Sequence, residues 1–194
     1  MRAPDDCIAL VLAAGRSRRF GSDKRIAMLP CGQTVLAATL ARVLEVFDDV
    51  RVVLRPGDDP VALAIDARAR IIWAEHADEG MGSSLAAGVC ALEQSQAKAV
   101  AVLLGDMPWV QAQTLQQLKA LSTAQQIVVP VYQGERGHPV LFGRHYWPAL
   151  QCLQGDQGGR KIILGAGDAC VYVPMGDAGV LRDVDWATDT APVH

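Results

Sequence analysis

A dense group of basic residues follows the first apolar segment of the chain. Five of the 18 Lys and Arg residues lie within ten positions, at Arg16, Arg18, Arg19, Lys24 and Arg25. Because the chain is acidic overall, with a formal net charge of −3 at pH 7, this local excess of positive charge indicates an anion-binding loop. Small residues just before it would let a ligand approach backbone N–H groups, which favours phosphate. A merely solvated basic loop is the alternative.

The spacing of this loop differs from two familiar phosphate-binding patterns. A Walker loop has four residues between its glycines and a lysine directly after the second, whereas five residues separate Gly15 from Gly21 and Lys24 comes three residues later. The loop also lacks the GxGxxG pattern of a dinucleotide-binding Rossmann protein. The sequence therefore predicts a phosphate site of another type.

A carboxylate occupies a second position suited to chemistry. Asp106 follows the apolar run 99–104 within a Gly-Asp-Met-Pro segment. The carboxyl end of a parallel strand is where open α/β sheets bind ligands, and a hard oxygen ligand suits Mg²⁺. An Asp-containing turn is the alternative reading of this segment. A second carboxylate is expected nearby, because one aspartate alone would hold Mg²⁺ loosely.

A glycine- and serine-rich segment at residues 79–85 precedes a predicted helix. Its glycines, Gly80 and Gly82, would admit a planar base or a ribose. Ser83 or Ser84 could cap the helix, and a plain helix cap is the alternative interpretation of the whole segment.

Apolar runs rich in Val, Ile and Leu alternate with segments of helical periodicity, as expected for a sheet covered by helices on both faces. Strands are predicted at residues 7–13, 50–54, 70–74, 99–104 and 127–132, with further strands at 138–142, 169–174 and 180–184. Helices are predicted at residues 34–47, 83–96 and 114–121 and near 158–164. We predict one α/β domain over residues 1–194, with a mainly parallel sheet and a mixed C-terminal edge.

Composition excludes several classes of protein. Hydrophobic residues make up 51% of the chain and charged residues 20%, which argues against disorder. Aromatic residues are only 5%, and no basic stripe extends beyond the loop, so a nucleic-acid partner is not expected. No apolar run reaches membrane-spanning length, and no signal-peptide pattern opens the chain, so we expect a cytoplasmic protein. The five scattered cysteines are expected to be reduced.

The basic loop resembles the LAAGxSxRxG signature, followed by lysine, of the molybdenum-cofactor nucleotidyltransferases, a MobA-like NTP transferase family. This resemblance implies a Rossmann-like three-layer sandwich of the nucleotide-diphospho-sugar transferase type. It implies that the loop wraps a nucleoside triphosphate, with Arg19 and Lys24 as catalytic residues on its phosphates. Arg16, Arg18 and Arg25 are not part of the pattern. The matching residues are Leu12, Ala13, Ala14, Gly15, Ser17, Arg19, Gly21 and Lys24.

The same resemblance implies the metal ligands and the base. Gly-Asp-Met-Pro looks like the family's metal-binding segment, with Asp106 as the ligand, and residues 183–189 resemble its C-terminal acidic segment, with Asp185 as the second ligand. The sequence departs from that segment at residues 186–188, and a capping aspartate is the alternative for Asp185. Ala14 in place of glycine, together with Gly80, Gly82, Ser83 and Ser84, resembles the branch that uses CTP rather than GTP.

Two further segments resemble the acceptor side of that branch. They contain His138, Asp156 and Arg160, of which Arg160 would meet the acceptor's phosphate and His138 its organic part. A turn histidine and a surface loop are the alternatives.

The implied reaction is Mg²⁺-dependent transfer of CMP from CTP to molybdenum-bearing molybdopterin, releasing pyrophosphate and making a cofactor for xanthine-dehydrogenase-like enzymes. A molybdoenzyme or its chaperone would be the protein partner. The alternatives are a guanylyltransferase using GTP, a sugar-1-phosphate nucleotidyltransferase, and a non-catalytic nucleotide-binding chaperone for cofactor insertion.

Overall fold

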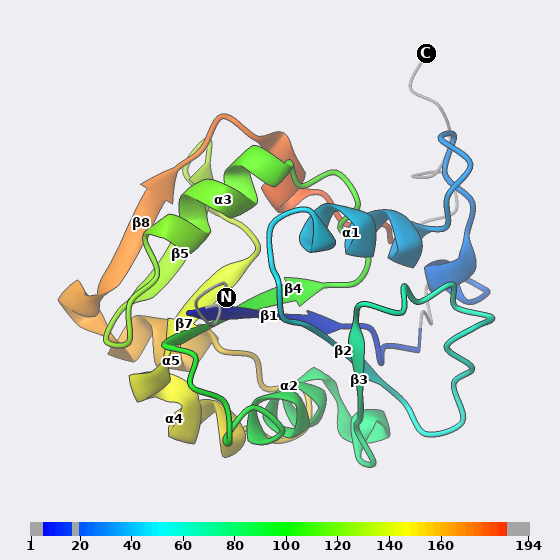
Figure 1. Cartoon of the computed structure of the whole chain (residues 1–194). Coiled ribbons are helices and arrows are strands. Elements are labelled where there is room, and N and C mark those ends of the chain that lie inside the picture. The colour runs from blue at the N-terminus through cyan, green and yellow to red at the C-terminus, as the bar shows by residue number, and fades with distance from the viewer. Residues whose placement is uncertain (1–5, 17–19, 186–194) are drawn as a thin grey trace.

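A mixed eight-stranded sheet lies between two layers of helices in the computed structural model, which describes residues 6–16 and 20–185 (Figure 1). Helices α1 (Val35–Leu44) and α3 (Ala112–Ala120) cover one face of the sheet, and α2 (Met81–Cys90), α4 (Trp147–Gln151) and α5 (Arg160–Gly165) cover the other (Figure 1). This arrangement confirms the predicted three-layer α/β class. The strands are β1 Cys7–Leu12, β2 Val50–Leu54, β3 Arg70–Trp73, β4 Ala99–Leu104, β5 Ile127–Tyr132, β6 Glu135–Arg136, β7 Val140–Gly143 and β8 Cys170–Pro174.

The parallel strands β1 to β4 lie together at one side of the sheet. Strands run in the order β3-β2-β1-β4-β7-β5-β6, and β8 pairs with β5. Strands β1 to β4 are mutually parallel, whereas β7 is antiparallel to both β4 and β5. The predicted mixed C-terminal edge is therefore confirmed, and it begins at β7.

The sheet has a hydrophobic core on each of its two faces. Each apolar strand contributes to both cores because its alternate side chains point to opposite faces of the sheet. In β1, Cys7, Ala9 and Val11 belong to the core beneath α1 and α3, and Ile8 and Leu10 belong to the core above α2 and α4. All five side chains are at most 2% exposed. A near-continuous apolar run is what such a two-sided strand requires.

Helices α1 and α2 are shorter than predicted, with 10 residues each, whereas α3, with 9 residues, is one residue longer than predicted. Helix α1 spans Val35–Leu44 with Thr34 as its N-cap, as predicted, where the Thr34 hydroxyl accepts a hydrogen bond from the Ala37 N–H. The others are α2 Met81–Cys90, α3 Ala112–Ala120, α4 Trp147–Gln151 and α5 Arg160–Gly165, and short 3₁₀ turns include η1 Lys24–Ile26, η2 Ala77–Glu79 and η5 Ala178–Leu181.

The predicted strand at residues 180–184 is wrong. The segment instead turns through η5, because the buried Asp177 carboxylate accepts hydrogen bonds from the Gly179 and Gln111 N–H groups and from the Thr114 hydroxyl. These bonds anchor the segment to the start of α3. From there the chain returns to the end of β4, where the Val184 N–H donates to the Asp106 carbonyl over 2.9 Å.

Throughout the described part of the chain, no helix combines the length and the apolar character needed to cross a bilayer.

Candidate active site

The carboxyl ends of β1 and β4 lie side by side and place the basic loop beside Asp106. Leu12 pairs with Leu104 in the register of these two parallel strands. The Gly105 N–H then donates to the Leu12 carbonyl over 2.9 Å, so the two strands leave the sheet together. This is the edge at which open α/β sheets bind ligands.

A cleft of about 440 Å³ opens at this edge, a size suited to a small-molecule ligand. The predicted site residues that line it are Leu12, Ala14, Gly15, Lys24, Gly80, Ser84, Asp106, Asp156 and Asp185. Lining residues that were not predicted as site residues are Phe20, Ala77, Asp78 and Leu104, whereas Glu79 and Met81 belong to the predicted segment 79–85. Arg16, which lies outside the family pattern, also lines it. Arg19 lies outside the described residues.

Lys24 joins the basic loop to two acidic groups from distant parts of the chain. Its Nζ lies 2.5 Å from Oδ2 of Asp106 and 3.4 Å from Oδ1 of Asp185. Burial alone would lower the pKa of Lys24, but its hydrogen bonds and charge interactions with these two carboxylates outweigh that effect and raise the pKa. Lys24 is therefore a cation throughout the physiological pH range.

Two carboxylates beside Lys24, those of Asp106 and Asp185, could hold a divalent metal ion. Among the described residues, Oδ1 of Asp106 is buried without a hydrogen-bond partner. Partial burial and then the charges of Asp185 and Asp106 raise the pKa of Asp183, which places a third carboxylate within electrostatic range. No group of three or more His, Cys, Asp or Glu side chains within residues 6–16 and 20–185 is arranged to hold a metal by itself. Mg²⁺ usually takes one or two carboxylates and completes its shell with phosphates and water, so Asp106 and Asp185 fit it.

Helix α2 begins differently from its prediction. Ser83 and Ser84 do not cap the helix, because it starts at Met81 and both serines lie within its first turns. The Gly82 N–H instead donates to the Gly155 carbonyl over 2.7 Å, and the Gly155 N–H donates to the Ser83 hydroxyl over 3.0 Å. A side chain at Gly82 would collide with the Gln157 carbonyl.

Gly80 meets both a conformational and a steric requirement at the cleft. Its φ of 140° is one that residues with side chains rarely adopt, and a Cβ there would collide with the Asp156 carboxylate and the Gly155 backbone. The loop around residue 155 therefore rests directly on the start of α2. The structure brings the predicted acceptor residue Asp156 against the predicted nucleotide-binding segment.

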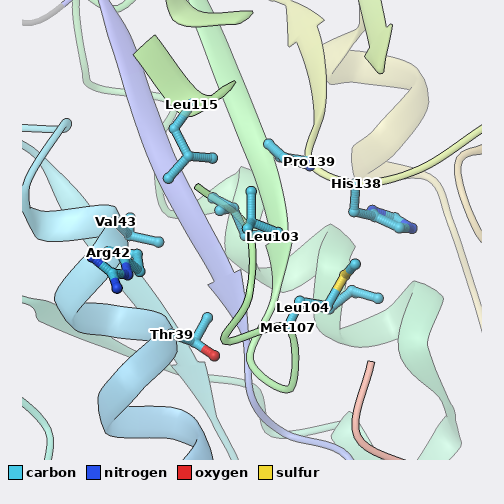
Figure 2. Close-up of a pocket in the computed structure, with 10 residues that line it drawn as sticks. Thr39, Arg42, Val43, Leu103, Leu104, Met107, Leu115, His138 and Pro139 are labelled. Carbon is cyan, nitrogen blue, oxygen red and sulfur yellow. The ribbon is translucent and has the colours of Figure 1, made fainter. Parts of the chain in front are cut away.

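The other predicted acceptor residues lie outside the cleft lining. His138 lines a separate cavity of about 10 Å³, which has α1 side chains such as Thr39 on one side and His138 with Pro139 on the other (Figure 2). A cavity of that size has room for one water molecule at most. Burial lowers the pKa of His138 despite the opposing effects of a hydrogen bond with the Val102 backbone and of the charges of Asp106 and Asp183. Arg160 is exposed at the start of α5.

The fold and the site together define an α/β protein that gathers a cationic loop and acidic groups at one edge of its sheet. The family model for the MobA-like NTP transferase domain matches residues 9–169 of this chain. The chain belongs to this family and is a nucleotidyltransferase.

Known proteins resemble the chain over nearly its whole length. It is 30% identical to the "Purine catabolism protein PucB" of Bacillus subtilis (strain 168), over 95% of this chain and 94% of that protein. The crystal structure of Rv0371c from Mycobacterium tuberculosis H37Rv is 29% identical, covers 97% of this chain and 96% of its own, and superposes with a TM-score of 0.84. A manganese complex of Rv0371c is 27% identical over 88% of each chain, with a TM-score of 0.74.

Proposed function

We propose that the chain transfers CMP from CTP to the terminal phosphate of a molybdopterin-type acceptor and releases pyrophosphate. One observation carries the proposal: Lys24 contacts both Asp106 and Asp185, and these three residues line the same cleft as Gly15. A triphosphate needs cationic and N–H donors along its tail, and its reacting end needs acidic groups that hold a divalent cation.

In this reaction an oxygen of the acceptor's terminal phosphate attacks the α-phosphorus of CTP, and the bond to the pyrophosphate oxygen breaks. Such chemistry depends on alignment and charge neutralisation rather than on a covalent intermediate with the protein. Lys24, Arg19 and the N–H groups beside Gly15 neutralise charge on the departing pyrophosphate. Asp106 and Asp185 would hold Mg²⁺, which would supply positive charge at the reacting phosphate. The relative Rv0371c forms a complex with manganese, which supports the use of a divalent cation.

Two features favour CTP and the molybdopterin-type acceptor. Ala14 and the segment that contains Gly80 and Ser84 match the cytidylyl branch of the family, and all three residues line the cleft. The relative PucB carries a name that refers to purine catabolism. Xanthine is a purine, so this name agrees with a cofactor destined for a xanthine-dehydrogenase-like enzyme.

The test measures pyrophosphate release from CTP, GTP, UTP and ATP, each with Mg²⁺ and with molybdopterin that carries molybdenum. We expect release with CTP, at least tenfold slower release with GTP, and formation of the cytosine dinucleotide. Asp106→Asn should lower the rate by about 10²-fold or more, whereas Asp168→Asn, an exposed aspartate of the turn Gly167–Ala169, should not change it. CTP binding without any pyrophosphate release would contradict the proposal and favour a nucleotide-binding chaperone.

A further inference from the structure

Arg25 lies in the basic loop but is not among the residues that line the cleft. The residue is only 5% exposed. Its guanidinium carries five N–H donors, and the structure provides an acceptor for each of them. Nε and Nη2 donate to the two oxygens of Asp23 over 2.9 and 2.7 Å, and Nη1 and Nη2 donate to the two oxygens of Asp58 over 2.6 and 2.8 Å. Nη1 also donates to the Ala13 carbonyl over 2.9 Å. No donor remains for a phosphate.

These bonds tie together the two ends of the basic loop and the connection that follows β2. Ala13 follows the end of β1, and its N–H donates to the Val53 carbonyl of β2. Asp58 lies in the connection after β2, where its carboxylate also accepts the Arg55 N–H. Asp23 is the N-cap of η1, the turn that contains Lys24. Arg25 therefore joins the start of the basic loop to its end and fixes both to the sheet.

The bond between Arg25 and Ala13 closes the loop that the family resemblance assigns to the triphosphate. Residues 13 and 25 are held together at the base, and Gly15 and Lys24 lie just inside this closure. Fixing these two ends lowers the entropy cost of holding Gly15 and Lys24 in place around a ligand.

We propose that Arg25 is a positioning residue for nucleotidyl transfer. Arg25 holds the backbone of Lys24 at a fixed distance from Ala13, where the basic loop starts. The inference rests on the proposed function, because it concerns how the same site binds its triphosphate. The matched pair of carboxylates requires an arginine: lysine has a single ammonium group and cannot make two bidentate contacts and a backbone contact at once.

The test compares Arg25→Lys and Arg25→Met with Arg51→Lys as a matched control. Arg51 also binds a neighbouring carboxylate in a bidentate way, through Nε and Nη2 to Asp49 over 2.6 and 2.9 Å, but it lies on β2 outside the cleft lining. Each variant is measured at a temperature at which circular dichroism shows it to be fully folded. The readouts are CTP affinity by calorimetry with Mg²⁺, and kcat and KM for pyrophosphate release.

We expect Arg25→Lys to weaken CTP binding about tenfold and to lower kcat about 10- to 100-fold, the scale for a misplacement of about 1 Å. Arg51→Lys should stay within twofold of the wild type on both readouts. In a Lys24→Met background, Arg25→Lys should have little further effect, because Arg25 acts through Lys24. A residue that only stabilises the fold would lower the melting temperature and leave these constants and this coupling unchanged.

The outcomes separate this inference from the proposed function. If folded Arg25→Lys has the CTP affinity and kcat of the wild type, the positioning role is overturned and nucleotidyl transfer still stands. The same conclusion follows if the effects of Arg25→Lys and Lys24→Met on these constants are fully additive in the double variant. If the wild type binds CTP but releases no pyrophosphate, nucleotidyl transfer fails, and the calorimetry of the variants still decides the role of Arg25. If the wild type binds no nucleoside triphosphate, both proposals fail.

Discussion

Replacement of Lys24 by Met removes the cation that lies between the carboxylates of the cleft while keeping most of the side chain's apolar volume. In the wild type, Lys24 is paired with Asp106 over 2.5 Å and with Asp185 over 3.4 Å. The variant leaves these carboxylates facing each other without that positive charge. We therefore expect the ligand-free variant to be less stable than the wild type and more responsive to divalent cations.

The exposure of the pair sets the size of the effect. The side chains of Lys24 and Asp106 are 17% and 19% exposed, which lies between a surface pair and a buried one. Surface pairs contribute about 0–1 kcal/mol, and breaking a buried pair costs about 3–5 kcal/mol, so we expect a loss of about 2 kcal/mol. For a chain of this size, that loss corresponds to a Tm lower by about 4–8 °C.

The assay is thermal unfolding with and without MgCl₂ or MnCl₂ at matched ionic strength. A cation that binds the folded variant at 100 times its Kd would restore about 2.7 kcal/mol, so the added metal should recover most of the lost Tm. Lys98→Met is the control, because Lys98 pairs with Asp6 over 2.8 Å with both side chains at least 60% exposed, and its Tm should change by less than about 4 °C. A Lys24→Met variant as stable as the wild type, with no larger response to metal, would refute this reasoning.

Three further predictions concern the loop, the start of α2 and a buried histidine. Gly15→Ala should leave Tm unchanged, because an added Cβ meets no atom within 4 Å, but should weaken CTP binding about tenfold where phosphate approaches the backbone; unchanged affinity by calorimetry would count against a phosphate at this glycine. Gly82→Ala should cost about 1–3 kcal/mol by displacing the Gln157 carbonyl, whereas Gly165→Ala, with open space around it, should not destabilise the protein; equal urea midpoints would disprove the contact. Because burial lowers the pKa of His138 below its usual 6.5, the unfolded chain gains this proton first and stability falls as the pH drops through 6.5. His138→Gln should therefore lose less stability than the wild type between about pH 7.5 and 5.5 in urea titrations, and identical losses would show that His138 is not responsible.

The parallel part of the fold could be predicted because each strand carries its own apolar signal. Strands β2, β4 and β5 have the predicted bounds, and both faces of β1 are buried as its continuous apolar run requires. The segment at residues 180–184 carries an apolar pattern similar to a strand. Its path is set instead by the long-range bonds of Asp177 to Gln111 and Thr114, which no local pattern reports.

In the candidate site, too, the residues in local sequence patterns could be predicted, whereas the contacts between residues distant in the sequence could not. Asp106 and Lys24 could be selected as candidates because each lies in a recognisable segment that follows a strand, and the structure brings them into contact. The basic loop did not reveal that Arg25 is neutralised by Asp23 and Asp58, since Asp58 lies 33 residues away. The contact of Asp156 with the start of α2 likewise depends on a loop–helix contact that only the folded chain creates.

Diffraction from crystals grown with CTP and Mn²⁺ would test the central claim most directly, because anomalous scattering locates the manganese independently of the nucleotide. We expect the anomalous peak at Asp106, with the triphosphate oxygens beside Lys24 and the backbone of Gly15. A nucleotide bound elsewhere on the molecule, or manganese bound away from Asp106, would contradict the account.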